Sequence, residues 1–257
     1  MKHFWALVFL MVPVCGVLTF IIAPHYNVWF PKDISANGHV IDHLFMFILW
    51  LTGIIFVATE GALFYFAWKY NARSNPEPVK FSHGSHTLEV VWTILPAVTL
   101  LFIAIYQMNA WADAKMRRPH IPVTAEITGR QFNWDVRYPG KDGVLHTPDD
   151  IVRTDGDIHF PSGEEVLLII KSQDVLHSFF LPNIRLKQDV VPGMDQYMWF
   201  KVPEPAVVDI VCAELCGWGH YKMQGRATFE PRPAFDEWLS QKYTEQESHR
   251  VAEAPIQ

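Results

Sequence analysis

Three long runs of apolar residues restrict the fold of this chain more than any other feature. They cover residues 4–23, 44–68 and about 90–111, and each holds about the 20 residues that an α-helix needs to cross a bilayer. Backbone groups in hydrocarbon must be paired within their own segment, so each run is expected to form a membrane-spanning helix. The 18 Phe and 10 Trp of the 257 residues fit this expectation.

The first run allows two interpretations. Lys2 ahead of a hydrophobic stretch is also typical of a cleaved secretion signal, but no clear small-x-small cleavage site follows it. Cys15 does not complete a convincing lipoprotein site either, and is most simply an apolar helix residue. We therefore expect residues 1–24 to be an N-terminal transmembrane helix or uncleaved signal anchor, and residues 40–111 a transmembrane helical hairpin.

The orientation follows from the connection between the second and third runs. This connection carries Lys69, Arg73 and Lys80 against Glu77, and positively charged loops stay on the cytoplasmic side. With three crossings, everything after residue 111 then lies on the outer, periplasmic face.

The region after the third run has the pattern of a β-domain. Short alternating or β-rich runs are separated by Pro and Gly turns, as in 124–138, 164–172, 195–202, 206–215 and 225–231. We predict an antiparallel sandwich or barrel over residues 112–240. A closing helix is expected over 233–246, and the polar residues 241–257 are assigned to a C-terminal tail. The predicted fold class is thus an α+β membrane protein.

Charge limits the partners of the outer region. From residue 112 onward there are 22 Asp and Glu against 16 Lys and Arg, so this part carries the whole negative balance of the chain. An acidic surface disfavours nucleic acid. It suits a basic protein partner that is steered by charge, although ordinary solubility would require the same balance.

Near the C-terminus, Cys212, Cys216, His220 and Met223 lie within twelve residues. Thiolate and thioether ligands select copper over hard cations, and Zn²⁺ rarely uses Met. His177 lies upstream, so two Cys could bridge two copper ions, each with one His and one weaker ligand. A structural disulfide or an incidental Cys pair is the alternative, and the spacing of His and Met disfavours it.

These residues resemble subunit II of the haem-copper cytochrome c oxidases. The segments LEVVWTILPA (88–97) and LKQDVVPG (186–193) match that family too, and the resemblance covers roughly residues 40–240. It implies a dinuclear CuA centre bridged by both Cys in a cupredoxin-like domain, where one His stands at a strand end and the other ligands share one loop. The implied ligands, including a backbone carbonyl from Glu214, are His177, Cys212, Glu214, Cys216, His220 and Met223.

The resemblance also implies a function. Such a subunit accepts electrons from a cytochrome c-type donor and passes them to haem in subunit I, which reduces dioxygen to water with coupled proton transfer. Expected partners are subunit I with its haems and CuB, subunit III, a basic donor and the bilayer of a bacterial inner membrane. No CxxCH occurs, so no haem is expected in this chain, which is not catalytic alone.

Two other functions remain to be weighed against this one. The first is a copper-free quinol oxidase subunit II acting structurally, and the full ligand set disfavours it. The second is the CuA domain of a nitrous oxide reductase. Three membrane helices, the WTILP segment and the lack of a propeller domain disfavour that reductase.

Two carboxylates have roles that the resemblance implies. Glu89 precedes the third run at its cytoplasmic mouth, where it would mark the entrance of a proton pathway into subunit I; a helix-start charge is the alternative. Glu214 would also bind magnesium through its side chain, shared with subunit I, because carboxylates are suitable hard ligands.

The residues that receive electrons are the least constrained. In GRQFNWDVRY, Phe132 stands where the family presents a Trp, and Trp134 matches a second Trp. Phe lacks the indole N–H, so Trp134 or Trp218 is considered as the donor contact, with core packing as the alternative. Acidic residues such as Asp174 are expected to guide the donor.

Overall fold

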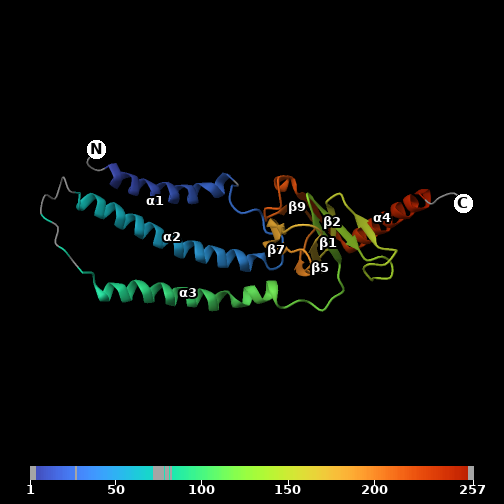
Figure 1. The fold of residues 1–257 in the computed structure, drawn as a ribbon, viewed down its shortest axis with the longest axis horizontal. Helices are drawn as coiled ribbons and strands as arrows, with labels where there is room; N and C mark the ends of the chain where they lie inside the picture. Colours follow the sequence, from blue (N-terminus) through green and yellow to red (C-terminus); the bar gives the residue numbers. More distant parts are fainter. Residues whose placement is uncertain (1–3, 27, 72–77, 79–80, 82, 254–257) are drawn as a thin grey trace. The chain divides into compact units, whose positions relative to one another are not determined.

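The computed structural model describes residues 4–26, 28–71, 78, 81 and 83–253 (Figure 1). Lys2, Arg73, Glu77 and Lys80, on which part of the predicted orientation depends, lie outside the described residues. The chain divides into two compact units, and each is described by itself. One unit holds residues 1–30 and 42–108, and the other holds residues 31–41 and 109–257.

The three apolar runs are helical, as predicted. Helices α1 (Phe4–Ile22), α2 (Gly38–Lys69) and α3 (His86–Lys115) are long and apolar enough to cross a membrane. Aromatic rings connect them inside the first unit. Phe20 of α1 lies edge-on to Trp50 of α2 at 5.4 Å, and Phe47 of α2 lies 5.5 Å from Tyr106 of α3.

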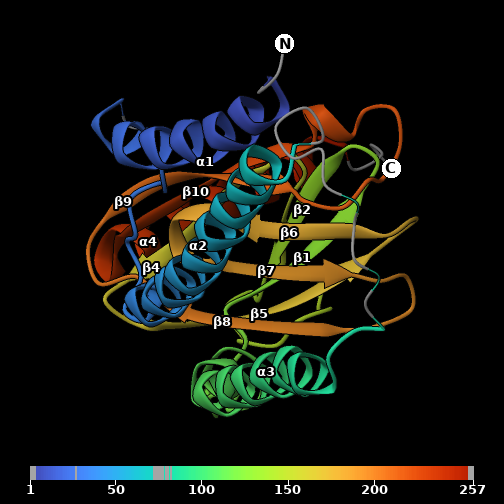
Figure 2. The same cartoon turned by 90° about the vertical axis from the view of Figure 1, so that its left-hand side faces the viewer.

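The second unit is built around a sandwich of two five-stranded sheets (Figure 2). The first sheet has the order β3-β2-β1-β5-β8, with bounds Ile151–Arg153, Asn133–Tyr138, Ala125–Arg130, Glu165–Ser172 and Gln196–Lys201. The second has the order β4-β10-β9-β6-β7, with bounds Asp157–Ser162, Gln224–Pro231, Ala206–Cys212, His177–Leu181 and Leu186–Val190. The predicted sandwich is present, but its sheets are not purely antiparallel, because β1 pairs with β5 and β4 with β10 in parallel.

The core lies between these sheets. Alternation along β2 buries Trp134, Val136 and Tyr138 while their neighbours stay partly exposed. The Tyr138 hydroxyl donates to the carbonyl of His159 at 3.0 Å and accepts from the His159 N–H at 2.8 Å. Full burial raises the pKa of this phenol and keeps it neutral. Edge-to-face packing of Trp134 on Phe179 joins the two sheets near the end that carries the metal ligands.

The closing helix is longer than the sequence predicts. Helix α4 spans Arg232–Glu253, so it continues beyond residue 246, where the predicted helix ends. Tertiary contacts extend the helix. Trp238 stacks on His159 at 4.0 Å, and Gln246 donates to the carbonyl of Asp150 at 2.6 Å and accepts from the N–H of Val152 at 3.0 Å.

Residues 31–41, which precede most of α2, belong to the sandwich unit. The N–H of Ile34 donates to the carbonyl of Asn183 at 3.0 Å, and the N–H of Ala36 donates to the carbonyl of Lys201 at 2.9 Å. The side chain of Asn183 returns a bond of 2.8 Å to the carbonyl of Lys32. No pattern in residues 31–41 predicts this docking.

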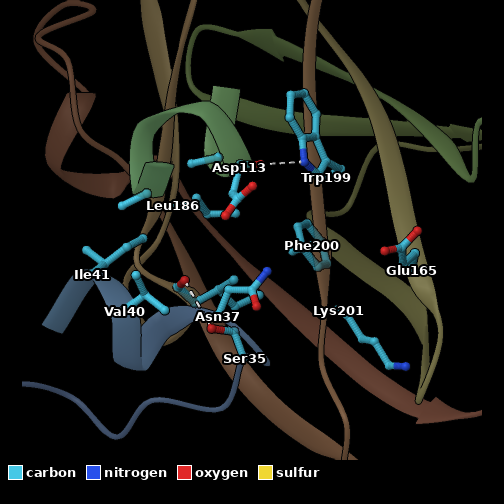
Figure 3. A pocket seen from close by; sticks show the side chains of 13 residues that line it. Ser35, Asn37, Val40, Ile41, Asp113, Glu165, Leu186, Trp199, Phe200 and Lys201 are labelled. Carbon is cyan, nitrogen blue, oxygen red and sulfur yellow. Dashed lines mark hydrogen bonds between the residues drawn. The ribbon is translucent and has the colours of Figure 1, made fainter. Parts of the chain in front are cut away.

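The end of α3 also contacts the sandwich. The indole N–H of Trp199 donates to the carbonyl of Asp113 at 2.9 Å (Figure 3). A small cavity of about 100 Å³ lies beside this bond, lined by the start of α2, the end of α3 and strand β8. The sandwich therefore holds both the segment that leads into α2 and the segment that leaves α3.

The loop between β2 and β3 covers a buried ionic cluster. Glu126 of β1 is 4% exposed. Its carboxylate forms ion pairs with Lys171 at 2.8 Å, His146 at 2.9 Å and Arg137 at 3.8 Å. Arg137 also pairs with buried Asp150 at 2.9 Å. The loop is thus held onto the sheet by ion pairs to the buried carboxylates of Glu126 and Asp150, whose partners are partly exposed.

Candidate metal centre

Adjacent strands bring the metal-ligating residues together. His177 is the first residue of β6, and Cys212 is the last residue of β9. These strands are neighbours, with Phe179 opposite Cys212 in an antiparallel register. The chain then forms the loop 213–223, with a 3-10 turn at His220–Lys222, and enters β10 at Gln224. One His at a strand end and the remaining ligands on one late loop are the arrangement that the sequence predicts.

The ligand atoms lie within a few ångströms of one another. Cys216 Sγ is 3.9 Å from Cys212 Sγ, 3.7 Å from Met223 Sδ and 3.6 Å from His220 Nδ1. Cys212 Sγ is 3.3 Å from the carbonyl oxygen of Glu214. The donor atoms of His177 and both Cys lie within 4.8 Å of one another. The predicted ligands therefore converge on one centre around Cys216.

The chemistry of this cluster fits a soft metal. The sulfurs of Cys212 and Cys216 stand at almost twice the length of a disulfide, about 2.05 Å, and both cysteines are free. His177 is fully buried, and its Nδ1 has no hydrogen-bond partner among the described residues. A buried ring nitrogen that forms no hydrogen bond destabilises the fold unless a ligand binds to it. Two unbridged sulfurs beside it, with the thioether of Met223 next to Cys216, are consistent with copper.

The pKa values of the two thiols are moved in opposite directions. Burial opposes ionisation of Cys212, but His177 and the backbone of the loop outweigh it and lower the pKa of this thiol to about 6. Burial, together with the neighbouring Cys212, raises the pKa of Cys216 to about 11. The Cys212 thiol thus ionises more readily than the Cys216 thiol, and binding of a metal by both would require both to lose their protons.

Asp174 holds the other side of His177. Its Oδ1 lies 2.7 Å from His177 Nε2, and its Oδ2 accepts the main-chain N–H of Gln131 at 2.7 Å. Burial opposes ionisation of Asp174, but these hydrogen bonds outweigh it and lower the pKa of its carboxyl. For His177, burial lowers the pKa, while contacts with Cys212 and Asp174 raise it overall. The acid predicted to guide a donor is thus also bonded to His177, a predicted metal ligand.

The aromatic residues predicted to receive electrons lie at different depths. Trp218 lies on the loop 213–223, which we call the metal loop because it carries predicted metal ligands. Its side chain is 82% exposed, and its ring stands edge-on to Phe132 at 5.4 Å. Phe132 packs so closely on the loop that a Cβ on Gly219 would lie 2.5 Å from its ring. Trp134 is fully buried, 6.0 Å from the His177 ring, so it cannot touch a docking protein.

The remaining predicted residues have clear positions. Glu89 lies in the first turn of α3, half exposed, with one carboxylate oxygen 3.9 Å from His86 Nδ1. It belongs to the helical unit and not to the metal cluster. The carbonyl oxygen of Glu214 lies 3.3 Å from Cys212 Sγ.

Sequence reasoning missed two residues. Gln131 donates from its side-chain amide to the carbonyl of Cys216 at 2.5 Å, and a lone Gln in a turn gives no signal of such a bond. Glu60 lies in the apolar part of α2, and its Oε2 is buried without a hydrogen-bond partner among the described residues. An acidic residue inside an apolar run was a usable signal for Glu60, because such residues are rare in membrane helices.

Comparisons with known proteins agree with this geometry. Residues 23–110 match the family described as cytochrome c oxidase subunit II, transmembrane domain, and residues 123–226 match its periplasmic domain. An alternative cytochrome c oxidase subunit 2 of Bradyrhizobium diazoefficiens is 29% identical, over 93% of this chain and 92% of that protein. A probable cytochrome c oxidase subunit 2 of Rickettsia bellii is 30% identical, over 76% of this chain and 77% of that protein.

Among solved structures, the periplasmic domain of subunit II of a Bradyrhizobium japonicum cytochrome oxidase is similar at 22% identity and a TM-score of 0.43. That likeness covers 49% of this chain and 97% of that chain. The two family matches together cover most of the sequence, from the membrane helices to the loop that carries the ligands. The chain has a membrane part, a periplasmic β-domain and a His and Cys cluster suited to copper, and it belongs to the cytochrome c oxidase subunit II family, whose members are subunits of an oxidoreductase complex.

Proposed function

We propose that this chain receives single electrons from a cytochrome c-type donor at a dinuclear copper centre and delivers them to haem in subunit I, where dioxygen is reduced to water. The observation that carries the proposal is the buried cluster of two unbridged cysteines beside a His177 Nδ1 that has no partner among the described residues. Bound copper would supply one-electron oxidation and reduction at this point.

Each ligand has a role in this proposal. Cys212 and Cys216 would bridge the metal pair, His177 and His220 would each bind one metal, and Met223 and the carbonyl of Glu214 would complete the set. Cys216 and Met223 are almost fully buried. Strands β6, β9 and β10 fix the ends of the ligand segments, so the ligands move little when the charge of the site changes. Small movement favours fast electron transfer.

The same proposal places the chain in a bacterial inner membrane, with the copper domain on the periplasmic side and subunits I and III as partners. The half-buried Glu214 is proposed to share a magnesium ion with subunit I through its side chain. Copper analysis and an electron paramagnetic resonance spectrum of the full-length chain test the centre. A protein that binds no copper would instead favour the structural role of a quinol oxidase subunit.

Electrons are proposed to enter through Trp218 and Phe132. Trp218 is the exposed ring of the pair, and Phe132 lies behind it against the metal loop. Large exposed aromatic side chains are typical of interaction surfaces. Asp174 is about one third exposed and adds negative charge close to the same loop, which would guide a basic donor.

Trp218→Ala is expected to slow oxidation of the donor by roughly tenfold or more, since truncation of a central interface Trp commonly costs about 2 kcal/mol or more. Stopped-flow mixing with the donor measures this rate, and copper content should not change. The rate should also fall as salt rises, because charge is screened over about 10 Å at 0.1 M. A larger defect in Phe132→Ala than in Trp218→Ala would move the contact to Phe132.

Glu89 is proposed to mark the entrance of a proton pathway. Its position in the first turn of α3 puts a half-exposed carboxylate at the predicted cytoplasmic edge of the membrane. In the assembled oxidase, Glu89→Ala should slow the proton-coupled reduction of the oxygen-binding site, while reduction of copper by the donor stays near normal. Glu89→Asp, which keeps the carboxylate, is the control. Unchanged turnover in Glu89→Ala would show that Glu89 serves only as a charge at the start of the helix.

A further inference from the structure

Gln131 contacts both halves of the metal centre. It lies in the two-residue turn between β1 and β2, where Arg130 pairs with Asn133. Its side-chain Nε2 donates to the carbonyl oxygen of Cys216 at 2.5 Å. The amide is so close to the metal loop that a Cβ on Gly217 would lie 2.8 Å from Nε2. The side chain therefore fixes the peptide that follows Cys216.

The main chain of the same residue reaches the other half of the centre. The N–H of Gln131 donates to Asp174 Oδ2 at 2.7 Å, and Asp174 Oδ1 lies 2.7 Å from His177 Nε2. The same Oδ1 accepts the N–H of Val175 at 2.6 Å, which orients the carboxylate. A continuous chain of hydrogen bonds thus runs from the carbonyl of Cys216 through Gln131 and Asp174 to His177.

This chain of bonds joins segments that are otherwise connected through strand pairing. Cys216 lies on the loop after β9, and His177 begins β6. The register between these strands pairs Phe179 with Cys212 and Phe180 with Val211, so the pairing ends before Cys216. Groups that bond to metal ligands orient them, and their loss typically lowers metal affinity by about 10–100-fold.

We propose that Gln131 is a positioning residue, which holds Cys216 at a fixed separation from His177 and thereby sets the copper affinity and the reduction potential of the centre. The inference rests on the proposed copper function. Because the bond to Asp174 comes from the main chain, a side-chain substitution at Gln131 removes the bond to Cys216 and leaves the bond to Asp174 in place.

The test compares Gln131→Met and Gln131→Ala with Asn133→Ala in the full-length, copper-loaded chain. Met is close in length to Gln and has no donor. Asn133 lies in the same hairpin, but its side chain bonds to Thr154 and Asp135 instead of the metal loop. Copper affinity against a competing chelator, the hyperfine pattern in the electron paramagnetic resonance spectrum and the reduction potential are measured for each protein.

Both Gln131 variants are expected to bind copper about 10–100-fold more weakly, with an altered hyperfine pattern and a shifted potential, while Asn133→Ala matches the wild type. Circular dichroism of the copper-free proteins shows whether each variant folds. If Gln131→Ala does not fold, the comparison of Gln131→Met with Asn133→Ala tests the proposal. Wild-type affinity, hyperfine pattern and potential in a folded Gln131 variant would overturn the positioning role and leave the copper function intact. Absence of coupled copper from the wild type would overturn both.

Discussion

Replacing Cys216 with Ser should abolish the mixed-valence copper signal of the full-length chain and prevent the binding of a copper pair. Cys216 Sγ lies 3.6–3.9 Å from ligand atoms of His220, Met223 and Cys212, so it is the sulfur on which the cluster converges. A hydroxyl oxygen is a hard donor that binds copper weakly at neutral pH and cannot replace a bridging thiolate. Electron paramagnetic resonance together with metal analysis measures the loss.

Cys15 supplies the matched control for this substitution. It is the remaining cysteine of the chain, it is exposed on α1, and it belongs to the helical unit instead of the unit that holds Cys212 and Cys216. Cys15→Ser should leave both the copper content and the spectrum unchanged. A coupled copper pair that survives in Cys216→Ser would contradict the bridging role of this residue.

Replacing Glu126 with Ala should lower the stability of the β-domain by about 1–3 kcal/mol. The Glu126 carboxylate is buried, and its removal leaves the partly exposed side chains around it without the acceptor that they contact, while Arg137 keeps its pair with Asp150. Glu126 is the member that Lys171, His146 and Arg137 share. The loop between β2 and β3 would lose the contact of His146 with the sheet, while Arg137 still bonds to Asp150. The midpoint of the β-sheet signal in circular dichroism during heating measures the effect.

Glu164→Ala is the comparison for this prediction. Glu164 pairs with Arg232 at 3.3 Å, and both side chains are about half exposed. Exposed ion pairs contribute only about 0–1 kcal/mol, so this variant should melt close to the wild type. Equal shifts in Glu126→Ala and Glu164→Ala would show that burial does not strengthen the Glu126 cluster.

The sequence alone was sufficient to predict the features that depend on the length of apolar runs and on the spacing of ligand residues. Apolar length predicts α1, α2 and α3, because a membrane leaves a helix as the simplest way to pair the backbone. The spacing of Cys212, Cys216, His220 and Met223 predicts a metal loop, because one short loop must bring soft ligands together. His177 lies upstream of this loop and was also a candidate from the sequence, but its approach to the two Cys depends on the pairing of β6 with β9.

The features that the sequence did not predict depend on tertiary contacts. The parallel pairing of β1 with β5 involves strands far apart in the chain. The residues of these strands do not indicate whether the strands pair in parallel or antiparallel. The extension of α4 to Glu253 depends on contacts such as that of Gln246 with Asp150. The bond from Gln131 to Asp174 uses a main-chain N–H, which every residue except Pro possesses.

The docking of residues 31–41 on the sandwich affects how this domain is made. Ile34 and Ser35 bond to residues near position 184, about 150 positions later in the chain. During synthesis, the early segment therefore cannot form these hydrogen bonds until the later residues that accept them have been translated and have crossed the membrane. Contacts of such long separation slow folding. A soluble fragment that starts at residue 112 would lack this segment, and the backbone acceptors of Asn183 and Lys201 would have to bond to water instead.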